Sequence, residues 1–414
     1  MNRLMSRFWI GQGSSNCLPE LPQELIDLII DELQTDVHAL QASALAGRVF
    51  LHRARTHLFR QLILAPPLSA SSLRKCRSPF SSPPLSVLRY VRKLRLIGLG
   101  NRGKEQWDPT ELHSILDALT NVQELSIVNV DALVLKLVQS ALSSKPLDTL
   151  FLNVLRFEDR DGFYSLIRSF SRLKHFSLHQ FQCDSPSSPP SSLITPNELD
   201  TLELAYHSYG SDVAEMLVDL RSLRRLKTLL VRPASTDDLE SIGSTIDATK
   251  GSLERLDVGA MRMISRPDGL PCLNLRHLQS LSLSISDSPV HQPLLRWWTD
   301  TLGASDEAYQ LEELVINVGV HFYDADVEES DVTSHFFAES YRWEELDKVL
   351  TRSQMRELRK VVVRIQLREG GEGAMTMMRE LEDVIRKGLS RLGRQSLLEV
   401  EVTDCLHRPG ICQA

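Results

Sequence analysis

The feature that most constrains the fold of this 414-residue chain is a recurring pattern, apolar-x-x-apolar-x-apolar, which occurs eleven times. The copies begin at Val91, Val122, Leu147, Leu173, Leu199, Leu226, Leu253, Leu278, Leu311, Leu358 and Leu397. Six consecutive intervals are 25 to 27 residues long, and the last three lengthen to 33, 47 and 39. A unit of this length cannot bury its own apolar side, so such units stack side by side into a solenoid.

Segments with apolar residues at helical spacing lie between the copies, at 110–119, 132–142, 162–170, 211–223 and 236–249. A further helix is predicted over 375–392, after a glycine-rich loop at 370–373. Short strands that alternate with returning helices resemble the leucine-rich repeat. The sequence therefore predicts an α/β solenoid over residues 89–404, with parallel strands on the concave face and helices on the convex face. Leu155, Phe181, His207 and Met261 stand where that family places asparagine or cysteine, so the repeats are degenerate.

Three glycines follow the first predicted strand at the spacing G-x-G-x-x-G, namely Gly98, Gly100 and Gly103. In dinucleotide-binding proteins this spacing brings the backbone up to a pyrophosphate at a helix N-terminus, and Asp131 stands near the end of the next strand. Here the following helix is predicted to begin only near Thr110, so the phosphate would have no helix terminus to bind. We interpret the run as the loop of the first repeat and predict no cofactor. An enzyme that uses this loop is the least favoured alternative.

Charge and cysteine content exclude several function classes. The net charge is −7 and the isoelectric point is near 6.0, which lacks the basic excess of nucleic-acid binding. The six cysteines form no C-x-x-C pair, which disfavours a zinc site or a disulfide framework and predicts a reducing compartment. No stretch reaches the roughly 18 apolar residues of a membrane span, so no membrane partner is expected.

Motifs for catalysis are absent from the sequence. It contains no serine in a glycine elbow, no cysteine with a plausible base and no helical pair of metal-binding histidines. The acids at 324–331 resemble a calcium loop in spacing but lack its glycine and its final glutamate, so an acidic loop within 322–345 is expected. The chain is predicted not to be an enzyme and to bind no metal.

The N-terminal region divides into a leader at 1–17, taken as disordered, and a helical segment at 18–64. Pro22 suits the first turn of a helix, and Leu25, Ile26, Ile29 and Leu33 recur at three and four residues. Two more short helices follow after residue 36. Three short helices cannot bury all these apolar residues among themselves, so part of the surface is expected to need a partner, unless it packs on the rest of the chain as a cap.

This segment resembles the F-box, and in particular the fungal F-box proteins. The match runs over Leu21-Pro22, Glu24-Leu25-Ile26, Ile29-Ile30, Leu33, Asp36-Val37, Leu40, Ser43-Ala44-Leu45, Arg48, Phe50 and His57-Leu58-Phe59. The resemblance implies docking on the Skp adaptor of a cullin-RING ubiquitin ligase, through Leu21, Pro22, Leu25, Ile26, Ile29, Leu33, Leu40 and Phe50. The family usually has a tryptophan where this chain has Phe50 and commonly a cysteine where it has Gly47. Gly47 is expected to end a helix and to shift the third one.

A Ser/Pro-rich stretch at 65–88 is predicted to be a linker, and residues 405–414 a tail. Residues between the apolar positions of each strand point to the concave face, where seven are candidates for binding a protein substrate: Lys93, Arg95, Phe151, His175, His179, Arg232 and Arg255. Phe151 is the candidate anchor, with an isolated exposed aromatic as the equal alternative. The last strand is acidic there, through Glu399 and Glu401. His175 and His179 lie about 13 Å apart along one strand, too far to share a metal.

These observations together predict a substrate receptor in the cytoplasm, the nucleus or both. The F-box would bind the Skp adaptor with its cullin-RING core, and the solenoid would hold a protein for ubiquitin transfer. The alternative is a scaffold without a ligase, whose helical segment caps the solenoid. The two differ in whether Leu25, Ile29 and Leu33 are free or packed inward.

Overall fold

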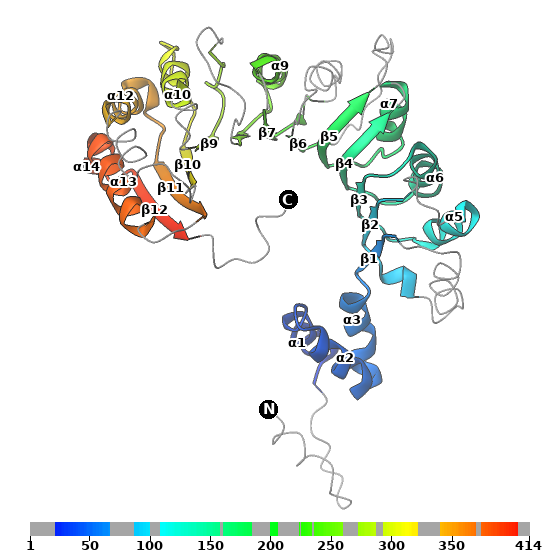
Figure 1. The fold of residues 1–414 in the computed structure, drawn as a ribbon. Coiled ribbons are helices and arrows are strands. Elements are labelled where there is room, and N and C mark those ends of the chain that lie inside the picture. The colour runs from blue at the N-terminus through cyan, green and yellow to red at the C-terminus, as the bar shows by residue number, and fades with distance from the viewer. Residues whose placement is uncertain are drawn as a thin grey trace, which may run out of the picture.

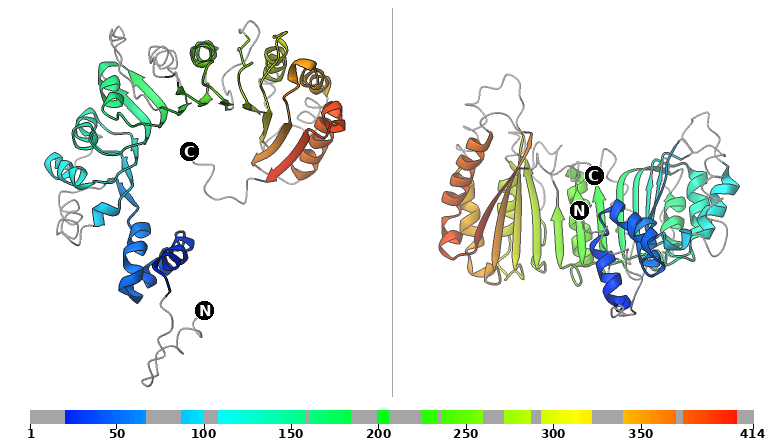
Figure 2. Two further views of the ribbon diagram at one scale, coloured as in Figure 1. Left: turned by 180° about the vertical axis from the view of Figure 1, so that it is seen from behind. Right: turned by 90° about the horizontal axis from the view of Figure 1, so that it is seen from below.

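The protein is an arc of parallel strands with helices on its outer side and a three-helix unit at its N-terminal end (Figure 1). The computed structural model describes residues 21–66, 87–99, 108–157, 160–183, 199–205, 223, 225–233, 236–259, 272–286, 293–321, 340–369 and 374–404. Seen from below, the strands stand side by side around the arc and the helices line its rim (Figure 2). The structure is therefore an α/β solenoid-like sheet preceded by N-terminal helices.

Twelve strands form one sheet whose order follows the sequence, and every neighbouring pair is parallel. The strands are β1 Gln61–Leu64, β2 Lys93–Ile97, β3 Glu124–Val128, β4 Thr149–Phe157, β5 His175–Cys183, β6 Thr201–Ala205, β7 Thr228–Arg232, β8 Arg255–Val258, β9 Ser280–Ser286, β10 Glu313–His321, β11 Lys360–Glu369 and β12 Leu398–Asp404. All eleven predicted strands are present, and β1 is an additional strand that lies within the segment predicted to be helical.

Three helices form the N-terminal unit: α1 Gln23–Glu32, α2 Val37–Ala46 and α3 Arg48–Leu58. The other helices of the described residues return the chain along the outer face, and they are α5 Pro109–Ala118, α6 Ala132–Leu142, α7 Arg160–Arg168, α9 Thr236–Thr249, α10 Pro293–Gly303, α12 Ser340–Leu350, α13 Ala374–Gly388 and α14 Ser390–Arg394. The loop predicted up to residue 345 is wrong from Ser340 onward, where α12 begins. The acids at 324–331, Gly100, Gly103 and nearly all of the predicted helix at 211–223 lie outside the described residues.

The single helix predicted over 375–392 is divided into α13 and α14. A buried carboxylate explains where α14 begins. Asp347 of α12 is 2% exposed and accepts hydrogen bonds from the backbone N–H groups of Arg391 and Leu392, at 3.0 and 3.1 Å. These N–H groups belong to the first turn of α14, where no carbonyl of the same helix is available to accept from them. Because the cap comes from 44 residues earlier in the chain, helical periodicity alone cannot reveal the break.

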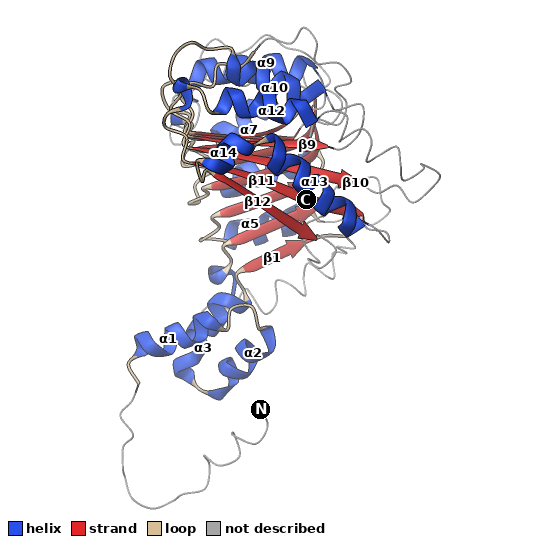
Figure 3. Cartoon of the chain, turned by 90° about the vertical axis from the view of Figure 1, so that its left-hand side faces the viewer, coloured by secondary structure: helices blue, strands red, loops and turns tan. Residues whose placement is uncertain are grey.

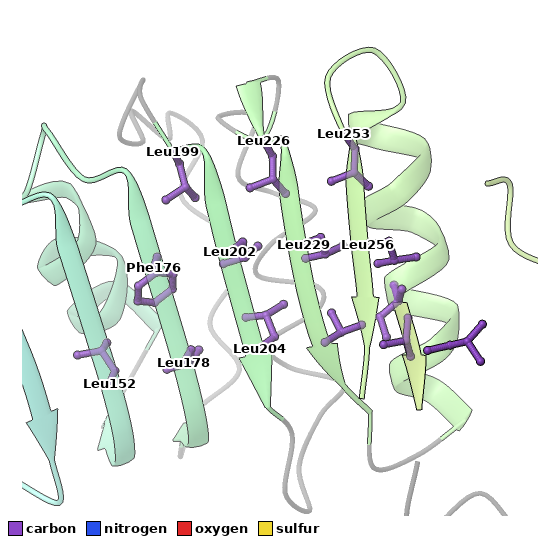
Figure 4. Close-up of a cluster of buried hydrophobic side chains, with 14 of the residues drawn as sticks. Leu152, Phe176, Leu178, Leu199, Leu202, Leu204, Leu226, Leu229, Leu253 and Leu256 are labelled. Carbon is purple, nitrogen blue, oxygen red and sulfur yellow. The ribbon is translucent and has the colours of Figure 1, made fainter. Parts of the chain in front are cut away.

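Leucines in register on adjacent strands build one continuous core between the sheet and the helices (Figure 4). Leu202 pairs with Leu229, which pairs with Leu256, and all three are fully buried. Leu155, at a position where leucine-rich repeats have a polar residue, is 2% exposed and joins this core. This position is thus filled by apolar packing.

Positive φ recurs at one position of four successive repeats, at Gly98 (62°), Asn129 (51°), Val154 (53°) and Gln180 (50°). Gly98 and Asn129 directly follow β2 and β3, whereas Val154 and Gln180 lie within β4 and β5, where the pairing between the two strands skips them. The N–H of Gly98 donates to the carbonyl of Val128 at 2.8 Å, and that of Asn129 to Asn153 at 2.9 Å. The backbone N–H groups of Gly98 and Asn129 are therefore satisfied by carbonyl groups of the next repeat.

The three-helix unit, α1 to α3, is distinct from the solenoid (Figure 3). It has its own small core of Ile30, Leu40 and Ala54, separate from the core of the sheet. It is joined to the sheet through the carbonyl of Arg60, which accepts from the N–H groups of Arg92 and Lys93 at 2.8 and 2.9 Å.

Candidate functional site

The helix α1 is apolar on two sides. Its inner side buries Ile26 and Ile30 at 8% and 2% exposure. Its outer side carries exposed Leu25, Leu28 and Ile29 at the spacing i, i+3, i+4, with 46%, 59% and 53% exposure, and Leu21, two residues before the helix, is 56% exposed. An exposed apolar stripe on a short helix is costly in water unless something covers it.

Further exposed apolar side chains lie on α2 and α3, namely Val37, Leu45 and Val49. The side chain of Gln23 donates to the carbonyl of Val49 at 3.3 Å, which places Val49 beside the start of α1. Seven of the eleven exposed large apolar side chains in the described part of the chain thus fall between residues 21 and 49. We call these seven the apolar face: Leu21, Leu25, Leu28, Ile29, Val37, Leu45 and Val49.

The structure separates the predicted adaptor-binding residues into two groups. Pro22 and the predicted residues of the apolar face, Leu21, Leu25 and Ile29, are exposed. The others lie inward: Ile26 and Leu40 are buried, and Leu33 and Phe50 are half-buried against the small core. Ile26 and Leu40 thus pack inside the unit, while Leu33 and Phe50 keep part of their surface exposed, and contact of these residues with an adaptor stays a prediction.

Two residues of the apolar face could have been found from the sequence. Leu28 lies three residues after Leu25 on the same helix, so helical spacing places it on the same outward side as Leu25. Val49 is the second residue of α3, which begins at Arg48 directly after Gly47, and its exposure depends on where that helix starts.

Gly47 separates α2 from α3, so the expected helix end at this residue is confirmed. Its φ of −180° is extended backbone that any residue adopts. A Cβ added there would lie 3.6 Å from the ring of Phe50, which is ordinary van der Waals contact. The glycine is therefore not required by the geometry of this junction.

An ionic clasp joins α1 to α3. Arg53 donates two hydrogen bonds to the carboxylate of Asp31, both at 2.5 Å, and His57 Nε2 lies 2.7 Å from Asp31 Oδ1. The bonds from Arg53 lower the pKa of Asp31 to about 2, with His57 contributing and partial burial opposing. The clasp fixes the angle at which α1 presents the apolar face.

We call the concave side of the sheet, which faces away from the helices, the strand face. It holds the predicted substrate-binding residues in separate rows across the strands. His175 and Arg255 lie in one row, because Thr201 and Thr228 connect them in register. Phe151 lies in the next row between Ser126 and Ser177 and is half-buried.

The remaining predicted residues do not converge on one another. Lys93 forms an ion pair with Glu124 on β3, and Arg95 is exposed on the same strand as Lys93. Phe151, His175 and Arg255 likewise stand apart from the pair that does converge, His179 and Arg232.

His179 and Arg232 meet at one carboxylate, Glu203, in the middle of the sheet. His179 Nε2 lies 3.3 Å from Glu203 Oε1, a guanidinium nitrogen of Arg232 lies 4.0 Å from the same oxygen, and Ser177 donates to Oε2 at 2.9 Å. The contact with His179 lowers the pKa of Glu203 most, with Ser177 adding to it and burial opposing. Glu203 stands between apolar positions of its strand, so the sequence pattern places it on this face, but that pattern does not identify it as the residue that contacts both His179 and Arg232.

A second carboxylate, Asp257, follows on β8 in the same row as Glu203. Burial raises the pKa of Asp257, against a hydrogen bond from Ser282. The centre of the strand face thus carries two carboxylates, Glu203 and Asp257, with Leu230 between them in the row and with His179 and Arg232 beside Glu203. This surface is suited to recognising a polar protein segment rather than an apolar one.

Only part of the glycine motif of the first repeat lies within the described residues. Gly98 directly follows β2, whereas Gly100 and Gly103 lie outside the described residues. Asp131, near the end of the next strand, accepts from the N–H of Val134 at 2.9 Å as the cap of α6, so its carboxylate is bonded to backbone.

In the described ranges, no group of three or more His, Cys, Asp and Glu side chains is arranged to hold a metal ion. No helix among those ranges is long and apolar enough to cross a membrane. Comparison of this chain with protein-family models and with curated proteins gives no match.

Proposed function

We propose that the protein is a substrate receptor of a cullin-RING ubiquitin ligase. In this proposal the three-helix unit is an F-box whose apolar face binds the Skp adaptor, and the solenoid, a degenerate leucine-rich-repeat array, holds a protein substrate on its strand face. The chain is then not an enzyme. It accelerates ubiquitin transfer by raising the effective concentration of the substrate near a ligase that other subunits supply.

The apolar face is the observation that carries this proposal. Leu25 and Ile29 are about half exposed, although the solenoid offers an extensive apolar core nearby. A helical unit that only capped the solenoid would turn such residues toward it. Instead the two cores are separate, which favours an external partner over the scaffold alternative. Fully burying each of these large side chains in an interface contributes about 1.5–3 kcal/mol.

The arrangement of the two surfaces also supports a receptor. The apolar face and the strand face lie on different parts of the chain, so one partner can bind each at the same time. A protein of this kind is expected in the cytoplasm, the nucleus or both, where the adaptor and cullin are found.

The test is co-purification of the full chain with the Skp adaptor and cullin. The variant Leu25→Asp, Ile29→Asp places two charges on the outer side of α1, and circular dichroism checks that it is folded. The matched control is Leu133→Asp, which puts a charge on an equally exposed leucine of the solenoid helix α6. The full chain and the control are expected to retain the adaptor, and the double variant to lose it by at least about tenfold.

Two outcomes would contradict the proposal. One is a full chain that does not retain the adaptor, which would leave the scaffold function. The other is equal retention by the double variant, which would show that the apolar face is not the contact.

A further inference from the structure

The last strand of the sheet, β12, is paired on one side only within the described residues, where its neighbour is β11. The N–H of Val361 on β11 donates to the carbonyl of Leu397 at 2.8 Å. Backbone groups of alternate residues point in opposite directions along a strand, so those of Leu398, Val400 and Val402 point to the other side. Within the described part of the chain, the seven residues of β12 thus form an open strand edge.

The outer apolar row of this edge is incompletely covered. Leu398, Val400 and Val402 are half-buried, whereas Val361 and Val363 on β11 are fully buried. The reason is that each strand of a solenoid is covered in part by the next repeat, and β12 has none among the described residues. A further strand would complete this apolar row.

The inner row of the edge is acidic. Glu399 forms an ion pair with Lys360 at 2.6 Å, and Glu401 accepts from Arg364 at 2.8 Å, both partners being on β11. The two carboxylates are 49% and 37% exposed. They therefore have cations on one side and room for cations on the other.

One side chain already occupies the open edge. The guanidinium of Arg386, on α13, donates to the carbonyl of Val400 at 3.4 Å, and its Nε donates to Glu382 at 2.7 Å. The carbonyl of Val400 is one that an added strand would bond. Arg386 is about half exposed, so it can be displaced without disturbing the core. Arg386 therefore covers part of the strand edge but can be displaced by an added strand.

We propose that β12 is a strand-addition site for an extended partner segment in which lysine or arginine alternates with aliphatic residues. The aliphatic residues would cover the row of Leu398, Val400 and Val402, and the basic ones would face Glu399 and Glu401. Backbone hydrogen bonds supply affinity in this mode of binding, and the alternating side chains supply specificity. This site is independent of the apolar face and of the proposed ligase function.

Charge argues against a second copy of this chain as the occupant. Pairing β12 with its own counterpart would bring Glu399 and Glu401 near the same carboxylates, and like charges across strands are destabilising. Pairing β12 with β1 of another copy would offer Gln61 and Ile63 to the acidic row, which supply no cation.

The test uses the full chain and a fluorescent acetylated heptapeptide that alternates lysine with valine, with binding followed by anisotropy. The same peptide with glutamate for lysine is expected to bind at least about tenfold more weakly. Arg386→Gln is expected to strengthen binding of the lysine peptide several-fold, because it frees the carbonyl of Val400. The control Arg379→Gln removes an equal charge from an exposed position of the same helix and is expected to have little effect.

Two further measurements separate strand addition from simple charge attraction. Val402→Pro removes an outward N–H while leaving the pairing with β11 intact, and it is expected to weaken binding at least tenfold. A lysine–valine peptide methylated on alternate backbone nitrogens should bind equally poorly to the unchanged protein, so the result does not depend on the folding of a variant.

Three results would overturn the proposal. One is equal binding of a peptide of scrambled order, and a second is full binding of the methylated peptide. The third is concentration-dependent self-association of the Arg386→Gln variant in sedimentation, which would make a second copy the occupant.

Discussion

At the residue scale, the four repeat positions with positive φ differ in how well their side chains tolerate that backbone. Gly98 and Asn129 are residue types that adopt it readily, whereas Val154 is β-branched and is strained there. Val154 is also 41% exposed, so its side chain contributes little burial in return. The position is a place where backbone strain is not offset by packing.

We expect Val154→Asn to stabilise the protein by about 1 kcal/mol, because asparagine is far more tolerant of the left-handed region than a β-branched residue. Urea unfolding followed by circular dichroism measures the change. Val154→Ala, which removes the branching but keeps a Cβ, should give a smaller gain. A loss of stability in the asparagine variant would show that Val154 contributes packing that its exposure does not reveal.

The residues of the candidate site were only partly predictable. Leu25 and Ile29 could be identified as outward because the helical period and the resemblance agree on them. Ile26 and Leu40 were placed in the same contact, yet they form the interior of the unit, since a helix that is apolar on two sides gives no period that distinguishes one side from the other. The meeting of His179 and Arg232 at Glu203 depends on register across three strands, which no local pattern contains.

At the scale of elements, the repeated strands were readable because their alternation is strict and their spacing recurs. The strand β1 fits the same pattern through Phe59, Leu62 and Leu64, but it was missed because Phe59 follows α3 directly and was assigned to the helical segment. The break between α13 and α14 was missed because Asp347, which caps α14, is remote in sequence. The second error comes from a contact that a short window of sequence does not hold.

The clasp between α1 and α3 gives the stability of the three-helix unit a pH dependence. The folded pKa of Asp31, about 2, lies below its ordinary value of 3.8. A carboxyl with a lowered folded pKa stabilises the fold above its ordinary pKa and loses that contribution as the pH falls through the window from 3.8 to about 2. Below that window, ionisation of Asp31 no longer stabilises the three-helix unit.

We therefore expect Asp31→Asn to lower the stability of the unit by about 1 kcal/mol near neutral pH, a modest value because both partners are about one-third exposed. The difference from the unchanged protein should shrink as the pH falls toward about 2. Pulsed hydrogen exchange of residues 21–59 across a urea series measures it. Glu32→Gln, a neighbouring exposed acid, is the control. A difference that is constant with pH would exclude ionisation of Asp31 as its source.

At the scale of the whole molecule, two separate cores predict two separable unfolding events. Leu40 is 1% exposed and belongs to a core with only two other buried residues, Ile30 and Ala54. Removing a buried leucine side chain costs about 2–5 kcal/mol, which is large for so small a core.

Leu40→Ala is thus expected to open residues 21–59 to hydrogen exchange while the protection of β4 to β11 stays unchanged. Hydrogen exchange with mass spectrometry reports both regions in one experiment. Leu229→Ala, at the centre of the sheet, should show the reverse result: β4 to β11 lose protection while the protection of residues 21–59 stays unchanged. Loss of protection in both regions of the Leu40→Ala protein would mean that the two cores unfold as one.

Every strand of the sheet lies next to its immediate predecessor in the chain, from β1 to β12. As the polypeptide emerges from the ribosome, each new repeat therefore finds its docking template already synthesised, and no strand must wait for a segment that has yet to be translated. Assembly can advance in step with synthesis, one repeat at a time, because each closure spans only the length of a repeat. A nascent chain halted between repeats is expected to carry a shorter arc of the same sheet, with its newest strand at the growing end.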